Sequence, residues 1–224
     1  MRSILMLVAA GTFAAGMPNL VAAQALVEDV RGKVAGIEFM DYVSRGSTIE
    51  LGSQGSVVLG YLNSCIRESI VGGIVTVGLR ESRVHNGSVE RTTVACDPGR
   101  ISLTDKEANQ SAATSFRSVD PIKTSHLTID EPAIVIYGLS PVIQTNTSGK
   151  LVITRLDAPG APREIMLNPK SLLRGRFYDF DKAKSSLAPG SYVASLGTSK
   201  TYFKIDSTAK PGATPIVGRL VRLQ

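Results

Sequence analysis

The sequence predicts an all-β protein built from two units. Short runs of β-branched and aromatic residues recur along its 224 residues, and Gly, Pro, Asn and Asp separate them at the spacing of turns. Heptads, tandem repeats and low-complexity tracts are absent from the sequence. The texture changes near residue 98, so we expect two β units joined by a connector with a short helix.

Residues 1–25 have the layout of a secretory signal peptide. Arg2 supplies a positive start, an apolar stretch follows, and Ala23-Gln24-Ala25 fits the small-x-small pattern of a cleavage site. The alternative is an uncleaved membrane anchor. Gly and Pro residues interrupt the stretch, however, whereas a spanning helix needs about 20 mostly apolar residues. We therefore expect cleavage, a periplasmic or secreted location, and no membrane span in the mature chain.

Residues 26–97 are expected to form the first β unit. Glycines break its first strand-like run at Gly32 and Gly36, and Gly72-Gly73 introduces another run. Asn86-Gly87 is a strong signal for a two-residue hairpin turn, so His85-Asn86-Gly87-Ser88 is the expected tip of a hairpin. The predicted strands before this hairpin lie at residues 27–39, 42–46, 48–51, 56–62 and 74–79.

Residues 98–129 are expected to connect the two units. Asp97-Pro98-Gly99 indicates a turn, and Thr104 followed by Glu107 has the pattern of a capping box at the start of a helix. The residues after it lack an apolar stripe. We therefore expect a short linker helix or a loosely ordered connector.

Residues 130–224 return to a strand-like texture. Two of the runs flank Gly197-Thr198-Ser199 and are expected to form a hairpin. Six or seven strands in about 95 residues are typical of an immunoglobulin-like β-sandwich. The predicted strands lie at residues 133–137, 151–156, 164–167, 176–178, 192–196, 201–205 and 216–223.

Cys65 and Cys96 are the two cysteines of the chain. In an oxidising compartment a lone pair of cysteines most often forms one disulfide. Redox chemistry would need a close motif such as Cys-x-x-Cys, and a metal site would need His or carboxylate ligands at suitable spacing. Neither pattern is present, so we expect a structural disulfide.

Positive charge is concentrated in the second unit. Residues 26–97 hold seven Lys and Arg against nine Asp and Glu, whereas residues 130–224 hold thirteen against seven. A basic exported domain could face anionic lipid, acidic polysaccharide or nucleic acid. Here the basic residues are scattered, which favours a solvated face, and no aromatic-interleaved basic patch indicates nucleic-acid binding.

The common catalytic and cofactor motifs are missing. There is no Gly-x-Ser-x-Gly elbow, His-Glu-x-x-His, Gly-x-Gly-x-x-Gly or phosphate-binding loop. His85 falls in the predicted turn and His126 in a strand-like run, where each fits a surface residue better than a catalytic base. We expect no enzymatic activity and no cofactor.

The first unit resembles the FecR family of bacterial envelope domains. The resemblance rests on Arg31-Gly32-Lys33-Val34, on Arg45-Gly46-Ser47-Thr48-Ile49, and on residues 52–59, which form a small-residue turn followed by a strand. It covers about a quarter of the chain, and the two cysteines are not part of its pattern. The family's usual arrangement implies a membrane-anchored regulator of a sigma factor.

A second motif lies at residues 187–192. Leu187, Pro189, Gly190 and Tyr192 resemble the tyrosine corner of immunoglobulin-like and fibronectin-like sandwiches, which implies that the Tyr192 hydroxyl bonds to upstream backbone. The motif indicates a fold and no chemistry, because such sandwiches serve many functions. The whole chain resembles exported envelope proteins of the alphaproteobacterial type.

These observations predict an exported, non-catalytic binding or interaction module of the bacterial envelope. Its partner is expected to be an envelope protein or a glycan, and the sequence does not give its oligomeric state. The candidate interaction residues are His85 and Asn86 at the hairpin tip and Arg174 and Arg176 on the basic face. Two alternatives stay open, a periplasmic hydrolase with an unrecognised site and a membrane-retained FecR-type signalling regulator.

Overall fold

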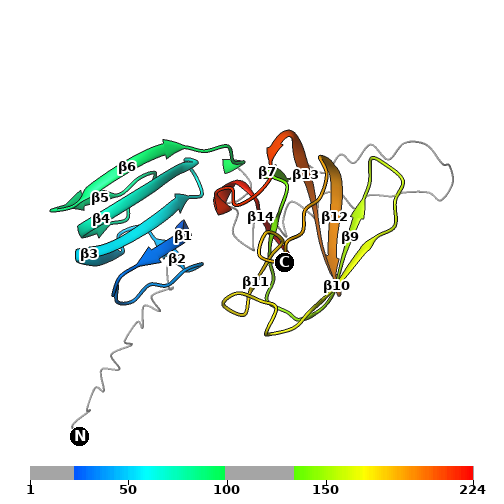
Figure 1. Cartoon of the computed structure of the whole chain (residues 1–224), viewed down its shortest axis with the longest axis horizontal. Helices are drawn as coiled ribbons and strands as arrows, with labels where there is room; N and C mark the ends of the chain where they lie inside the picture. Colours follow the sequence, from blue (N-terminus) through cyan, green and yellow to red (C-terminus); the bar gives the residue numbers. More distant parts are fainter. Residues whose placement is uncertain (1–22, 99–133, 224) are drawn as a thin grey trace, which may run out of the picture.

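A computed structural model describes residues 23–98 and 134–223 of the chain. These residues form fourteen strands and one short 3-10 helix, arranged as two β units side by side (Figure 1). The predicted all-β class is therefore confirmed for this part of the chain. The expected helical connector lies almost entirely outside the described residues, as do the first 22 residues of the expected signal peptide.

The first unit is one six-stranded sheet. Its order is β2-β1-β3-β4-β5, and β6 also pairs with β4. Side chains alternate between the two faces of each strand. Val27, Leu59 and Ile70 thus lie on the inner face, where they are buried in an apolar core. The strands are β1 (Ala23–Arg31), β2 (Tyr42–Ser44), β3 (Thr48–Tyr61), β4 (Ile66–Thr76), β5 (Arg83–His85) and β6 (Ser88–Thr93).

Strand β1 contains the last three residues of the expected signal peptide. Ala23 pairs with Ser44 on β2, and Ala25 is fully buried. The carbonyl oxygen of Gln24 accepts a hydrogen bond from the Leu62 N–H at 3.0 Å. Strand β1 therefore includes Gln24 and Ala25, which the sequence pattern assigns to the signal peptide.

The predicted hairpin with its tip at residues 85–88 is wrong. Strands β5 and β6 both pair with β4, so they form one interrupted edge strand. Asn86 has φ 54°, and the chain bends there opposite Gly72-Gly73. A Cβ on Gly73 would lie 2.2 Å from the His85 carbonyl oxygen, and one on Gly87 would lie 2.2 Å from that of Gly72. The Asn-Gly pair absorbs a bend in the sheet, and glycines allow the backbones to approach closely.

A buried glutamate holds the loop between β4 and β5 against the first unit. Glu68 is fully buried on the inner face of β4, where it accepts hydrogen bonds from the Ser82 N–H at 3.0 Å and the Arg91 Nε at 2.8 Å. The Ser82 hydroxyl lies 2.8 Å from the Tyr61 hydroxyl. Burial is the main cause that raises the pKa of Tyr61 to about 12. These contacts satisfy the polar groups that this interior contains.

The second unit is built from two sheets that share one core. The larger has the order β10-β9-β12-β13-β7 and the smaller β11-β8-β14. Ile143 and Val221 of the smaller sheet join Leu151 and Phe203 of the larger in the core. The strands are β7 (Ile134–Gly138), β8 (Val142–Gln144), β9 (Gly149–Arg155), β10 (Arg163–Leu167), β11 (Phe177–Asp179), β12 (Gly190–Leu196), β13 (Ser199–Lys210) and β14 (Leu220–Arg222).

The hairpin expected around residues 197–199 is present. Strands β12 and β13 pair along their length, with Leu196 opposite Ser199 at the turn. Close to the start of β12, the Tyr192 hydroxyl donates a hydrogen bond to the carbonyl oxygen of Ala188 at 2.8 Å. This is the bond to upstream backbone that the residues around Pro189 and Gly190 predict.

The predicted strand at residues 216–223 is only partly right. The 3-10 helix η1 (Ile216–Gly218) comes first, and the short strand β14 follows it. The Val217 N–H is used in a contact with the first unit, where it donates to Glu28 Oε1 at 2.9 Å. Residues 216–223 therefore contribute to the contact between the units through η1 and to the smaller sheet through β14.

Arg219 and Asp179 form a buried ion pair in the second unit. Their side chains are only 4% and 3% exposed, and the two groups meet at 2.6 Å. Arg219 also donates to the carbonyl oxygens of Ser140 and Thr214, at 2.9 and 3.0 Å. One guanidinium group thus joins the end of β11 to two loops.

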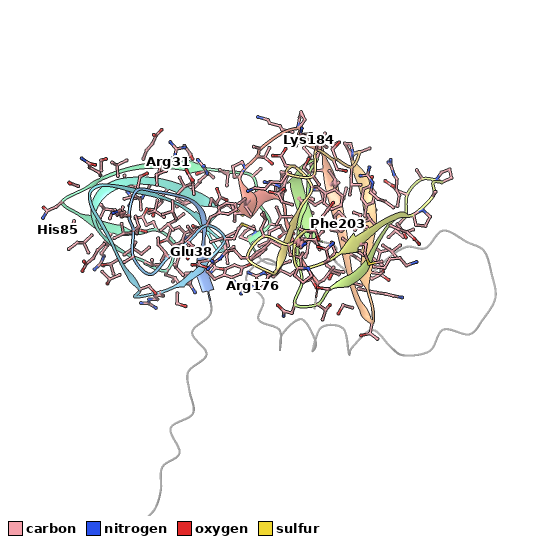
Figure 2. All side chains as sticks on the ribbon, turned by 60° about the horizontal axis from the view of Figure 1, so that its bottom comes forward. Arg31, Glu38, His85, Arg176, Lys184 and Phe203 are labelled. Carbon is pink, nitrogen blue, oxygen red and sulfur yellow. A yellow bond between two sulfur atoms is a disulfide. The ribbon has the colours of Figure 1, made fainter. Side chains whose placement is uncertain are left out.

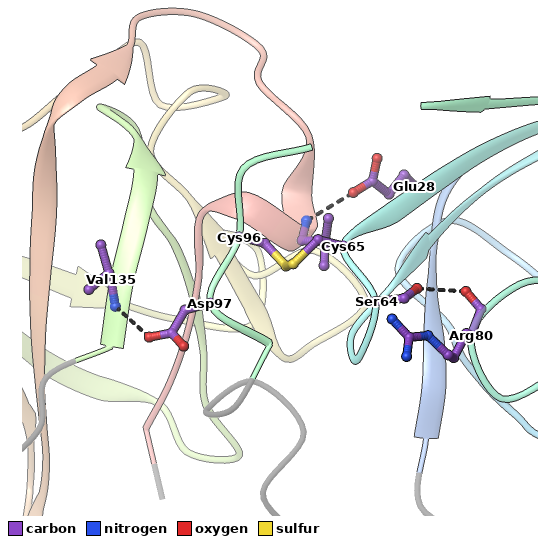
Figure 3. Close-up of a disulfide and its surroundings, with 8 residues drawn as sticks. Glu28, Ser64, Cys65, Arg80, Cys96, Asp97 and Val135 are labelled. Carbon is purple, nitrogen blue, oxygen red and sulfur yellow. Dashed lines mark hydrogen bonds between the residues drawn. A yellow bond between two sulfur atoms is a disulfide. The ribbon is translucent and has the colours of Figure 1, made fainter. Parts of the chain in front are cut away.

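The Cys65–Cys96 disulfide is present and lies close to the second unit (Figure 3). It joins the turn between β3 and β4 to the chain after β6, across a Cα–Cα distance of 5.7 Å. The next residue, Asp97, accepts a hydrogen bond from the Val135 N–H at 3.1 Å. The bridge therefore fixes the segment by which the first unit contacts the second.

Removing this bridge is expected to destabilise the protein. Replacing Cys65 and Cys96 together with Ala should lower the free energy of unfolding by about 3–4 kcal/mol, because the bridge closes a loop with a sequence separation of 31 residues. Urea unfolding without reductant measures this loss. The reduced wild-type chain should match the double variant, and a loss below about 1 kcal/mol would contradict the stabilising role.

Candidate functional site

The two units meet through a shared apolar core. Leu26 and Leu62 of the first unit pack with Phe177, Val217 and Leu220 of the second, and all five are buried. Two glycines allow close approach here. A Cβ on Gly60 would lie 3.2 Å from the Val217 Cβ, and one on Gly218 would lie 2.4 Å from the Ala95 carbonyl oxygen. The units are therefore in direct contact and not merely tethered.

Polar contacts fix how the units meet. The Tyr42 hydroxyl donates to Gln144 Oε1 at 2.6 Å, across the contact. Arg174 contacts Glu38 and also donates to Asp41, at 3.0 Å. Arg174 is one of the sequence-predicted interaction residues, and it is already engaged by two carboxylates of the first unit. These two carboxylates balance the charge of Arg174, so no external ligand is needed to account for it.

One cavity at this contact is a charged cleft of about 530 Å³. Its charged walls are largely paired within the protein. Glu28 binds Arg67 at 2.8 Å, Asp179 binds Arg219 at 2.6 Å, and Lys182 lies 4.9 Å from the ring of Phe39. The lining residues include Glu28, Asp29, Arg67, Asp179, Asp181, Lys182 and Arg219. Most of these charges stabilise the walls, so few are left to recognise a ligand.

A second cavity, which we call the junction groove, has a volume of about 550 Å³. It runs along β2 and the start of β3 and is completed by one residue of the second unit, Arg176. The lining residues are Gly36, Ile37, Asp41, Tyr42, Val43, Ser44, Ser47, Thr48, Ile49 and Arg176. Four of these residues carry hydroxyl groups, and Arg176 adds a guanidinium group.

Two arginines near this groove have no acidic partner. Within residues 23–98 and 134–223, no carboxylate lies in ion-pair distance of Arg176 or Arg222. Arg176 lies over the ring of Phe177 and Arg222 over that of Tyr42, at 5.4 and 5.1 Å. The buried Nε of Arg222 has no hydrogen-bond partner among the described residues. Burial raises the pKa of the Tyr42 phenol, and the two guanidinium charges oppose this shift.

The acidic side chain in the groove is already bound. Asp41 accepts hydrogen bonds from Arg174, at 3.0 Å, and from the Glu38 N–H, at 2.7 Å. Near Tyr42 there are therefore three guanidinium groups, of Arg174, Arg176 and Arg222. They are matched by two carboxylates, of Glu38 and Asp41. The surplus is one positive charge, and Arg176 and Arg222 are both partly buried. Such a site favours an anionic group of a ligand.

The structure separates the sequence-predicted interaction residues. Arg174 binds Glu38 and Asp41 of the first unit. Arg176 also lies at the contact between the units, whereas His85 lies at the far end of the first unit (Figure 2). His85 and Asn86 are exposed on the bent edge strand and not at a hairpin tip. The sequence thus indicated one arginine of the groove, Arg176. It also indicated His85 and Asn86, which belong to a remote surface.

Tyr42 of the groove and the arginines near the end of the chain gave weaker signals in the sequence. Tyr42 sits in a short strand-like run and resembles any other aromatic residue of a β unit. Arg219 and Arg222 interrupt an apolar run near the end of the chain. Charges in such a run need partners when they are buried, so this interruption was a usable sign of a polar contact.

A pair of free carboxylates at Asp179 and Asp181 and a metal site are two arrangements that other kinds of site would need. Asp179 is held by Arg219 and is not a free carboxylate beside Asp181. Among residues 23–98 and 134–223, no cluster of three or more His, Cys, Asp or Glu side chains has the arrangement of a metal site. His126 lies outside the described residues.

No described helix has the length and apolar character needed to cross a membrane.

Comparison with known proteins gave no match to a protein-family model, a curated protein or a solved structure.

Proposed function

We propose that the chain is an exported, non-catalytic interaction module of the bacterial envelope, and that the junction groove binds an anionic group of its partner. The observation that carries this proposal is the pair Arg176, which lines the groove, and Arg222, which lies over the ring of the groove residue Tyr42. Neither has a carboxylate in ion-pair distance among the described residues. Because both units contribute to the groove, the site depends on their contact. In this proposal, the contact between the two units forms the binding site.

The finer fold assignments are part of the proposal. We propose that the first unit is FecR-like and the second immunoglobulin-like. The glycine-bounded strands of the first unit and the Tyr192 to Ala188 hydrogen bond of the second support these assignments. The disulfide supports an oxidising compartment, since such bridges are rare in the cytosol.

Export carries its own expected result. We expect the mature chain to start at Gln24, because Gln24 and Ala25 belong to β1 and are buried. A cut after Ala23 leaves the Gln24 contacts to Leu62 and Asn63 in place. The intact mass and N-terminal sequence of the exported protein measure the cut. A mature chain that starts at Leu26, or one that keeps residues 1–22, would contradict this expectation.

Charge reversal in the groove tests the binding proposal. Wild type and Arg176→Glu serve as baits in envelope extracts with chemical cross-linking, and Arg83→Glu on β5 is the matched control at an exposed remote arginine. We expect Arg176→Glu to lose a partner that wild type and Arg83→Glu both capture. Thermal unfolding checks that the variants stay folded. Equal capture by all three baits would refute binding at the groove.

A further inference from the structure

Two strand edges that have no partner among the described strands line the junction groove. Strand β2 ends the sheet order and pairs only with β1 among the described strands. Strand β3 pairs with β1 from Ser56 onwards, so residues 48–51 have β4 on one side and no described strand on the other. Tyr42, Val43 and Ser44 of β2 and Thr48 and Ile49 of β3 all line the groove.

The hydrogen-bond pattern directs free main-chain groups away from the existing sheet. In an antiparallel ladder, residues alternate between pairs that exchange hydrogen bonds and pairs that do not. The Val27 N–H donates to the Asp41 carbonyl oxygen at 2.8 Å. The next residue pair, Leu26 with Tyr42, is therefore not hydrogen-bonded. It follows that the N–H and C=O of Tyr42 point away from β1.

The same alternation applies at the start of β3. The Val77 N–H donates to the Ser47 carbonyl oxygen at 2.9 Å, so the following pair, Thr48 with Thr76, is not hydrogen-bonded. The N–H and C=O of Thr48 therefore point away from β4. Both Tyr42 and Thr48 line the groove. An extended chain lying there would find main-chain donors and acceptors on β2, on β3 or on both.

Two other sheet edges, at β5 with β6 and at β7, carry features that discourage strand addition. The edge formed by β5 and β6 is bent at Asn86 and carries Glu90 and the inward-pointing Arg91, which are protective features of edge strands. At the edge strand β7, the Val135 N–H is occupied by Asp97. The edge at β2 lacks a comparable block in its described surroundings and has Arg176 beside it.

We propose that the junction groove binds an extended acidic peptide segment of a partner protein. The segment adds as a strand along β2 and the start of β3 and places a carboxylate on Arg176. Charge complementarity favours this occupant, because Asp41 is already bound by Arg174 and no carboxylate of the described residues lies in ion-pair distance of Arg176. The inference rests on the proposed binding function and names the class of partner.

Designed peptides test this inference on the full chain. The probes are eight-residue peptides of alternating Thr and Val, with Glu at either end, together with Gln counterparts. We expect a Glu peptide to bind about tenfold more tightly than its Gln counterpart, since a charge-assisted hydrogen bond is lost. Binding should slow hydrogen exchange at the Tyr42 and Thr48 amides. Failure of every peptide to bind at millimolar concentration overturns the proposal.

Main-chain methylation separates strand addition from simple anion binding. Two sets of peptides carry N-methyl groups on alternate residues, either the odd or the even ones. Methylation of one set should abolish binding and methylation of the other should not, since only every second amide faces a strand. On the protein, Thr48→Pro should weaken binding and Thr48→Ala should not, because only Pro removes the N–H. Thermal unfolding shows whether Thr48→Pro stays folded, and the methylated peptides decide the matter if it does not.

The outcomes distinguish the two proposals. If Arg176→Glu loses binding but methylation of neither set of peptide residues has an effect, the groove binds an anion and strand addition is overturned. Binding of all peptides that is equal in Arg176→Glu and wild type would overturn both. An acidic glycan fragment that outcompetes the peptides without slowing exchange at Tyr42 and Thr48 would also overturn the peptide assignment.

Discussion

Replacing Asp179 with Ala is expected to lower the free energy of unfolding by about 3–5 kcal/mol. The substitution removes the carboxylate that binds Arg219 at 2.6 Å and leaves a guanidinium group that is only 4% exposed. A buried charge without its partner costs far more than an exposed one. Urea unfolding of the purified chain measures the loss.

Two further variants show whether the loss comes from the stranded charge. Glu164→Gln breaks the exposed pair with Lys150, and we expect its effect to stay within about 0.5 kcal/mol. The double variant Asp179→Leu with Arg219→Met should recover much of the lost stability, because apolar side chains of similar volume replace the pair. If Asp179→Ala costs no more than Glu164→Gln, the ion pair does not hold the second unit together.

Replacing Glu68 with Ala is expected to have an effect of similar size, about 3–5 kcal/mol. Glu68 is fully buried and accepts hydrogen bonds from Ser82 and Arg91. Its loss leaves the Ser82 N–H without that acceptor and opens a cavity beside Tyr61. The loop between β4 and β5 should then detach before the rest of the unit unfolds.

Trypsin provides a local measurement of that detachment, because the loop region contains Arg80 and Arg83. We expect cleavage at these sites to become faster in Glu68→Ala under native conditions. Glu50→Ala, at an exposed position of β3, is the control and should leave both stability and cleavage close to wild type. Unchanged cleavage in Glu68→Ala would show that the loop is held by other contacts.

Much of the fold followed from local sequence patterns. The all-β class and the hairpin around Gly197-Thr198 depend on turn residues, and the disulfide depends on the compartment. Local sequence contains the signals for both. The hairpin expected at Asn86-Gly87 is wrong because the same turn signal serves a bend opposite Gly72-Gly73. That contact lies between neighbouring strands, and the turn residues alone do not specify which strand they face.

The groove was only partly foreseeable for the same reason. Arg176 was indicated by the basic character of the second unit, yet its surroundings come from β2, more than a hundred residues earlier in the chain. Whether an arginine has an acidic partner depends on tertiary packing. Arg174 finds Glu38 and Asp41, whereas Arg176 finds none among the described residues. Charge patterns along the sequence do not distinguish these two arginines.

Site-specific photo-cross-linking in the native envelope tests the central claim most directly. A photoreactive amino acid replaces Thr48, which lines the junction groove, or His85, which is exposed at the far end of the first unit. We expect irradiation to give a defined protein adduct from position 48, which Arg176→Glu in the same chain abolishes, and none from position 85. An adduct from position 85 with none from position 48 would contradict the account and return the binding surface to the bent edge strand.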